Sequence, residues 1–147
     1  MESTQANGRS PAPRSLRRAA RLGRVATWDD VERLALALPE TDEGTTYGNR
    51  AWRVAGKPFA WERPLRASDL AALGERAPDG PILAARVEEV LVRDALIEAE
   101  PDVYLTTPHF EGYPIVLVQL DAIAVDALGE LLADAWTARA PARLLRG

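Results

Sequence analysis

The pattern of apolar and polar residues predicts a long helix at each end of the folded part of the chain and strands between them. After Thr27, a typical N-cap residue, Trp28, Val31 and Leu38 recur at helical spacing, and Pro39 ends the helix. An inward apolar stripe predicts a second helix over residues 125–138. The longer strands are expected at residues 50–55, 58–62, 82–87 and 115–120. This order predicts an α+β fold, an antiparallel β-sheet covered on one face by the N- and C-terminal helices.

Weaker signals predict four shorter elements. We expect a short strand at Thr45 to Tyr47 and a helix that is capped by Ser68 and ends near Gly74. A further helix is expected from Arg93 to Ala99, and a strand from Val103 to Thr107.

The segment from Tyr47 to Pro64 reads as a β-hairpin with the sequence YGNRAWRVAGKPFAWERP. A two-residue turn at Gly56-Lys57 pairs its strands so that one face carries Trp52, Val54, Phe59 and Trp61. These side chains suit the core beneath the helices, although exposed aromatics in such a hairpin can also stack on nucleic-acid bases.

Basic residues concentrate in the same hairpin and give residues 50–66 a net charge of +4 within an acidic protein. They are the candidate phosphate contacts if the hairpin binds nucleic acid, and a solvated surface is the alternative. These candidate nucleic-acid-binding residues are Arg50, Arg53, Lys57, Arg63 and Arg66.

Composition fits a single domain without membrane or disulfide features. The 147 residues are 47% hydrophobic, enough for one core, and contain no cysteine. No apolar run approaches the roughly 18 residues of a membrane helix, and no signal peptide is evident. We therefore expect a cytoplasmic protein that does not bind membranes, and we expect it to be a monomer.

Charge divides the chain into two parts. Residues 1–26 contain six arginines and one glutamate, a net charge of +5, whereas the whole protein has a net charge of −4. We expect residues 1–24 to form a disordered basic arm and residues 25–147 a single domain. The arm is interpreted either as a leader without function or as an anion-binding segment.

The candidate chemistry argues against an enzyme. Residue Ser68 is expected to be a helix cap, His109 is the sole histidine, and no Gly-rich phosphate loop is present. His109 is interpreted as a loop residue or as a ligand or phosphate contact. No metal site and no cofactor are expected, because the acidic residues near 29–43 read as a solvated face rather than a cation site.

Four separated segments together resemble the MmcQ/YjbR family: ALPET, TTYGNRAWRVAGKPFAWERP, TTPHFEGYPIVLVQL and LLADAWTARAP. The resemblance spans about residues 27–144 and implies a CyaY-like (frataxin-like) α/β sandwich. It also implies a DNA-binding role through a double-wing arrangement of hairpins, with one wing around Gly56-Lys57 and the other at the His109 loop.

Two hypotheses of function follow. The first is a non-enzymatic DNA-binding protein that contacts phosphates through the basic hairpin. The alternative is a module that binds a small molecule or a protein, on an open sheet face or in the pocket where the His109 loop meets the hairpin. Iron handling is a third hypothesis that rests on the analogy with the frataxin-like fold and on the general acidity of the chain.

Overall fold

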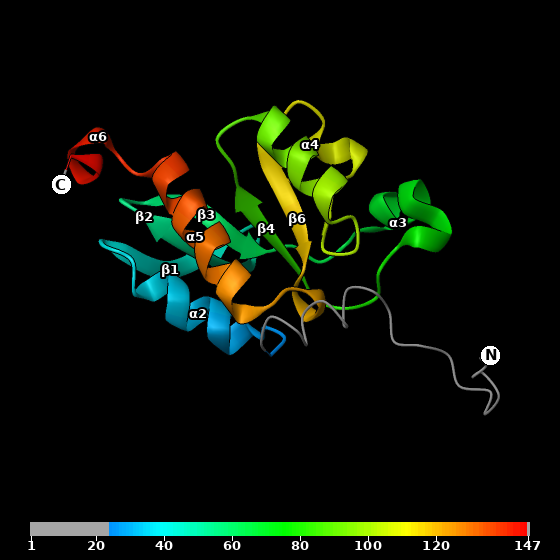
Figure 1. Ribbon diagram of the computed structural model, residues 1–147, viewed down its shortest axis with the longest axis horizontal. Helices are drawn as coiled ribbons and strands as arrows, with labels where there is room; N and C mark the ends of the chain where they lie inside the picture. Colours follow the sequence, from blue (N-terminus) through cyan, green and yellow to red (C-terminus); the bar gives the residue numbers. More distant parts are fainter. Residues whose placement is uncertain (1–23, 147) are drawn as a thin grey trace, which may run out of the picture.

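The computed structural model describes residues 24–146 as an α+β domain built on one antiparallel sheet (Figure 1). The predicted disordered arm lies outside the described residues, apart from Arg24. The sheet has six strands in the order β1-β2-β3-β4-β6-β5. The strands are β1 Thr41–Thr46, β2 Asn49–Val54, β3 Lys57–Glu62, β4 Ile82–Arg86, β5 Tyr104–Leu105 and β6 Ile115–Gln119. The helices are α2 Trp28–Leu36, α3 Ala67–Leu73, α4 Val90–Ala99, α5 Val125–Arg139 and the short α6 Ala142–Leu145.

The predicted terminal helices are confirmed, and both cover one face of the sheet. Helix α2 starts at the predicted cap, where the backbone N–H of Asp30 donates to the Thr27 hydroxyl and the Thr27 N–H donates to the Asp30 carboxylate. Helix α5 packs on β3 and β4 and beside α2, as Figure 1 shows. Helix α4 adds Leu96 and Ile97 to the same apolar layer. No described helix is long and apolar enough to cross a membrane.

Several short elements differ from their predicted bounds. The strand expected at 45–47 is six residues long and starts at Thr41, whereas the strand expected at 103–107 pairs only at Tyr104–Leu105. Helix α4 begins at Val90, before the predicted start. Ser68 lies inside α3 rather than at its cap, because the carboxylate of Asp69 accepts the Arg66 N–H at 2.8 Å and closes that end.

The predicted register of the hairpin is wrong. The turn residues are Ala55 and Gly56, with φ of +50° and +82°, the conformation of a type I′ turn. Strand β3 also carries a bulge, because Trp52 pairs with Ala60 and Arg53 pairs with Pro58, which leaves Phe59 between them.

The turn and the bulge place the two tryptophans of the hairpin on opposite faces of the sheet. Trp52 and Phe59 are fully buried beneath the helices, as predicted. Trp61 pairs with Ala51 and packs in a second, smaller cluster on the opposite face. The members of that cluster are Ile82, Ala84, Phe110, Ile115 and Leu117, with Trp61, Leu65 and Leu105 at its edge.

Candidate functional site: a cationic and aromatic cleft

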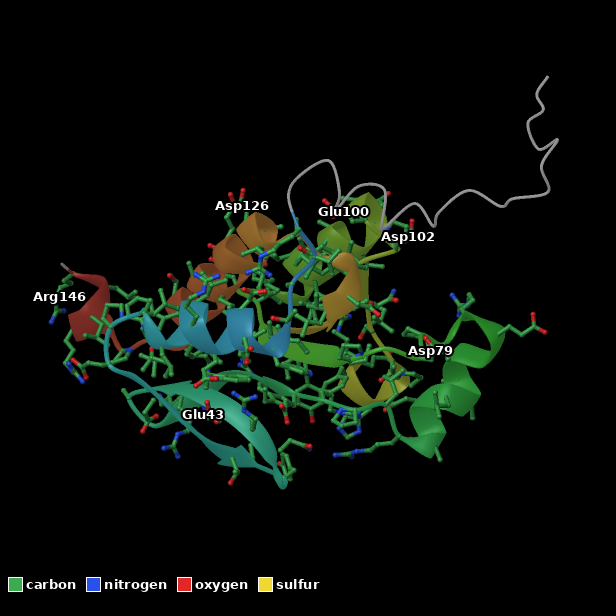
Figure 2. The ribbon with its side chains drawn as sticks, turned by 90° about the horizontal axis from the view of Figure 1, so that it is seen from below. Glu43, Asp79, Glu100, Asp102, Asp126 and Arg146 are labelled. Carbon is green, nitrogen blue, oxygen red and sulfur yellow. The ribbon has the colours of Figure 1, made fainter. Side chains whose placement is uncertain are left out.

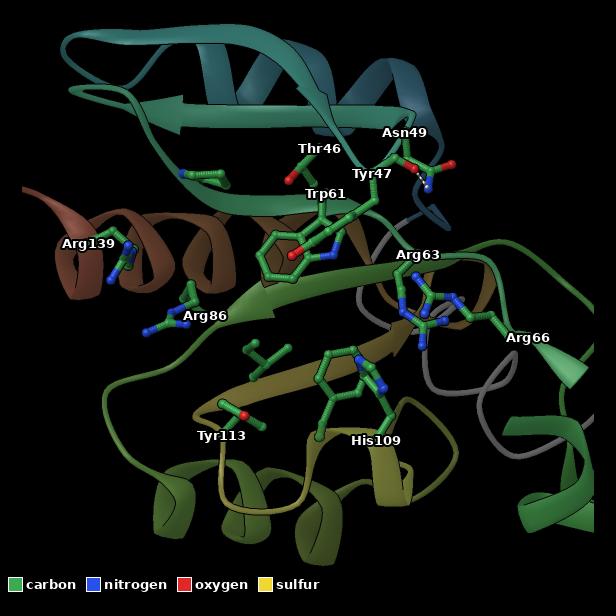
Figure 3. A pocket seen from close by; sticks show the side chains of 13 residues that line it. Thr46, Tyr47, Asn49, Trp61, Arg63, Arg66, Arg86, His109, Tyr113 and Arg139 are labelled. Atoms are coloured by element: carbon green, nitrogen blue, oxygen red, sulfur yellow. Dashed lines mark hydrogen bonds between the residues drawn. The ribbon is translucent and has the colours of Figure 1, made fainter. Parts of the chain in front are cut away.

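A cleft of about 420 Å³ opens on the sheet face that α2 and α5 leave uncovered (Figure 3). It lies where the β1–β2 turn and strand β3 meet the loop that follows β5, which is the place predicted for a pocket beside the His109 loop. A single 3₁₀ turn, Pro108–Phe110, carries His109 on that loop. The lining residues are Thr46, Tyr47, Asn49, Pro58, Trp61, Arg63, Arg66, Arg86, His109, Phe110, Tyr113, Ile115 and Arg139.

Two arginines meet at one end of the cleft, and none of the described lining residues supplies a carboxylate to balance them. Arg86 ends β4 and Arg139 ends α5, so the topology brings together two positions that are distant in sequence (Figure 3). Burial, together with the positive charge of Arg139, lowers the pKa of Arg86. In each of these side chains Nε is buried and has no hydrogen-bond partner among the described residues. An anion bound between the guanidinium groups would relieve their mutual repulsion.

A third arginine lies deeper at the other end of the cleft. The side chain of Arg63 is 4% exposed, and its Nη1 donates to the Asp69 carboxylate at 2.9 Å and to the carbonyl of Pro64 at 2.6 Å. Its guanidinium lies 5.1 Å from the ring centroid of Phe110, and its Nη2 is buried without a partner in the described structure. Arg63 therefore forms part of the cleft wall, with its charge paired to Asp69.

The aromatic walls come from two separate segments. Trp61 lines the β3 side, and His109 lies opposite it in Figure 3. The His109 ring stands edge-on to Phe110, with the ring centroids 4.8 Å apart. The loop itself is fixed from below, because Nη1 of the buried Arg93 donates to the carbonyls of Phe110 at 2.9 Å and of Tyr113 at 3.0 Å. These bonds hold the loop that carries His109 in place in the absence of a ligand.

The five cations predicted for the hairpin do not share one surface. Arg50 lies on the helix-covered face, where it bonds Glu43 and Glu32 and sits 5.0 Å from the Trp52 ring centroid. Arg53, on the other face, makes two hydrogen bonds to the Asp42 carboxylate.

The remaining predicted residues divide between the hairpin tip and the cleft. Lys57 is exposed next to the turn. Arg63, Arg66 and His109 line the cleft together, so the structure brings three of the six candidates to one site. The buried, paired Arg63 is placed to contact a ligand inside the cleft rather than a phosphate on the protein surface.

Asp69 pairs with the lining residue Arg63, whereas the acidic side chains labelled in Figure 2 lie away from the cleft. Figure 2 shows Glu43 beside the hairpin, Asp79 near α3 and Asp126 at the start of α5. None of the described residues that line the cleft is acidic. Within residues 24–146, no group of three His, Asp or Glu side chains is arranged to hold a metal ion. The cleft is therefore a concentrated positive region on a protein whose net charge is −4.

Sequence reasoning missed Arg86 and Arg139 and assigned Trp61 to the wrong face. Arg86 ends an apolar strand and Arg139 the last turn of a helix, where a basic residue is already favoured by the helix dipole. No local pattern distinguishes these two arginines from paired ones, since Glu88 and Glu89 follow Arg86 closely in the sequence.

The sheet, its covering helices and this cleft define an α+β domain with a cationic, aromatic site on its open face. The YjbR family model matches residues 36–138. Uncharacterized proteins of Mycobacterium tuberculosis and Mycobacterium bovis are each 50% identical over 125 residues, which cover 83% of this chain and 95% of the relative. The chain belongs to the YjbR family, as its sequence resemblance indicated.

A solved structure supports the fold. The crystal structure of a Deinococcus radiodurans protein with a DUF419 domain superposes with a TM-score of 0.57 at 20% identity, covering 76% of this chain and 77% of that one. The likeness concerns the fold alone. It leaves the CyaY-like part of the expectation as a prediction.

Proposed function

We propose that this protein is a non-enzymatic binding module for a small anionic ligand, which it holds in the cleft described above. The observation that carries the proposal is the Arg86–Arg139 pair: both arginines line the cleft, neither Nε has a hydrogen-bond partner within residues 24–146, and no described lining residue is a carboxylate that could offset their charge. Other arginines of this domain each form an ion pair with a carboxylate, as Arg53 does with Asp42 and Arg143 with Glu40. An unpaired cationic pair in a preformed cleft is expected to serve an anion.

Inorganic phosphate tests the proposal directly. At constant ionic strength, phosphate should raise the thermal midpoint of the full chain, because a ligand that binds only the folded state stabilises it by RT ln(1 + [L]/Kd). Arg86→Met and Arg139→Met should each abolish that rise. Without phosphate, each variant should be at least as stable as the parent, since one of two mutually repelling charges has been removed.

Arg76→Met is the matched control, because Arg76 is exposed and lies outside the cleft. It should leave the response to phosphate unchanged. An equal response in the parent, Arg86→Met and Arg76→Met would show that phosphate acts on the protein generally, and the cleft would then have no part in binding.

DNA binding is the second proposal, and the exposure of Lys57 and Arg66 favours it. Within the described part of the chain neither side chain takes part in an ion pair, whereas Arg50, Arg53 and Arg63 do. If only these two cations contact phosphates, log K should fall with log salt at a slope of roughly −2, and five contacts would give roughly −4 to −5. Anisotropy of a labelled short duplex across salt measures the slope.

Charge reversal then locates the contacts. Lys57→Glu combined with Arg66→Glu should abolish duplex binding, while Arg76→Glu should reduce it only slightly through net charge. If the double variant still binds the duplex with the parent's affinity, Lys57 and Arg66 do not contact DNA, and the proposal of DNA binding through the hairpin is wrong.

A further inference from the structure

The geometry of the cleft also indicates what kind of anion it takes, an inference that rests on the function just proposed. Figure 3 shows Trp61 between two groups of arginines, with Arg86 and Arg139 on one side and Arg63 and Arg66 on the other. A simple inorganic anion needs only the first group. The aromatic walls between the groups would then have no role in binding.

The Arg86–Arg139 pair favours a doubly charged group. Two guanidinium groups close enough to lower the pKa of one of them are only half neutralised by a carboxylate. A phosphate monoester carries about −1.5 to −2 charges at neutral pH and offers three acceptor oxygens to the two forks of donors. It therefore matches the combined charge of the two arginines, and its oxygens can accept from the guanidinium N–H groups that line the cleft.

The walls favour a flat ring attached to that phosphate. Trp61 faces the cleft instead of the core because of the bulge at Phe59, and it is only partly buried there. Placing a large aromatic ring on an open face leaves apolar area that a ligand ring can cover. Thr46 and Asn49 also line the cleft and carry polar groups, although the Asn49 Nδ2 already donates to the carbonyl of Tyr47 at 3.4 Å.

We propose that the cleft binds a phosphate monoester carried by a flat heteroaromatic group, that is, a nucleotide. The phosphate lies between Arg86 and Arg139, and the base lies against Trp61 with His109 across from it. The cavity of about 420 Å³ is of the size that holds small ligands. A free mononucleotide and the 5′-phosphorylated end of a single strand share this chemistry, and the second group of cations, Arg63 and Arg66, lies where a strand continues.

Calorimetric titration of the full chain at constant ionic strength separates the two parts of the ligand. The probes are inorganic phosphate, adenosine, AMP and a 5′-phosphorylated oligothymidylate. AMP should bind about 5- to 150-fold more tightly than phosphate, the range that stacking one base on an aromatic side chain provides. Adenosine should bind more weakly than AMP, because it lacks the group that the arginines hold.

Variants assign each part to its residue. Trp61→Leu should reduce the affinity for AMP to that for phosphate and leave phosphate binding unchanged, whereas Arg86→Met should remove both. Trp28→Phe is the matched control, because Trp28 stacks on Trp52 and contributes to the opposite, helix-covered face. It should change neither affinity.

The outcomes distinguish this inference from the function on which it rests. Equal affinities for AMP and phosphate, unaffected by Trp61→Leu, would overturn the nucleotide while the anion-binding module stands. Failure of both phosphate and AMP to bind would overturn both proposals. Tighter binding of the oligothymidylate than of AMP, lost in Trp61→Leu and Arg86→Met, supports the nucleotide with a strand as its source.

Discussion

Replacing Asp69 with Asn should lower the free energy of unfolding by about 3–5 kcal/mol, the cost of leaving a buried charge without its partner. Asp69 and Arg63 form an ion pair of 2.9 Å in which the two side chains are only 2% and 4% exposed. Asparagine keeps an oxygen for the N–H of Arg66 at the start of α3, so the helix cap survives. The expected loss of stability therefore comes from the positive charge of Arg63, which is left buried without a negative partner. It is a large fraction of a domain stability of about 5–15 kcal/mol.

Urea unfolding of the full chain measures this loss. Asp79→Asn is the control for an exposed carboxylate near the same helix and should change stability by no more than about 0.5 kcal/mol. Adding Arg63→Met to Asp69→Asn removes the stranded charge, so the double variant should be more stable than Asp69→Asn alone. A double variant no more stable than the single one would mean that the pair is not the source of the loss.

The same pair makes stability depend on pH. Burial alone raises the pKa of Asp69, but hydrogen bonds from the Arg66 N–H and from Arg63 outweigh it and hold the pKa below its ordinary value. The stabilisation is present above the unfolded-state pKa of about 3.9 and is lost as the pH falls through the lower folded-state value. Asp69→Asn should therefore flatten the decline in stability below about pH 4.

Truncating the two hairpin tryptophans should have very different effects. Trp52 is fully buried, so Trp52→Ala should lower the free energy of unfolding by about 3–5 kcal/mol. Its ring stacks on Trp28 with the ring centroids 6.4 Å apart, and this contact is lost when the side chain is removed. Trp61 lies partly exposed at the cleft, so Trp61→Ala should cost no more than about 2 kcal/mol.

Urea unfolding of both variants, side by side, checks the contrast. A loss for Trp61→Ala as large as that for Trp52→Ala would restore the reading in which both rings belong to the core. Phe59→Ala is a useful third point, because Phe59 is buried with Trp52 and should group with it in stability.

The sequence predicted the long, strongly patterned elements because their signals are local. The cap at Thr27, the apolar run of β6 and the stripe of α5 each lie within one segment, and each element formed where expected. The short strands were misjudged, since pairing with neighbours rather than local pattern decides how far a strand such as β1 extends. The hairpin register failed because it depended on one turn position and on the extra residue at Phe59.

The cleft was only partly predictable. His109 and the hairpin were expected to meet, and they do. The two arginines on which the proposed anion site rests were not expected, because Arg86 and Arg139 are separated by 52 intervening residues and approach only through the packing of α5 across the sheet. Local pattern does not report such a contact. Absence of a carboxylate partner is visible only once the neighbours of each charge are known.

The bulge at Phe59 also constrains how this hairpin can change during evolution. Inserting or deleting one residue between Arg53 and Ala60 shifts the strand by one position and exchanges the two faces. Trp61 would then turn toward the helices, and a core residue would enter the cleft. We therefore expect relatives that keep the cleft to keep the length of this hairpin.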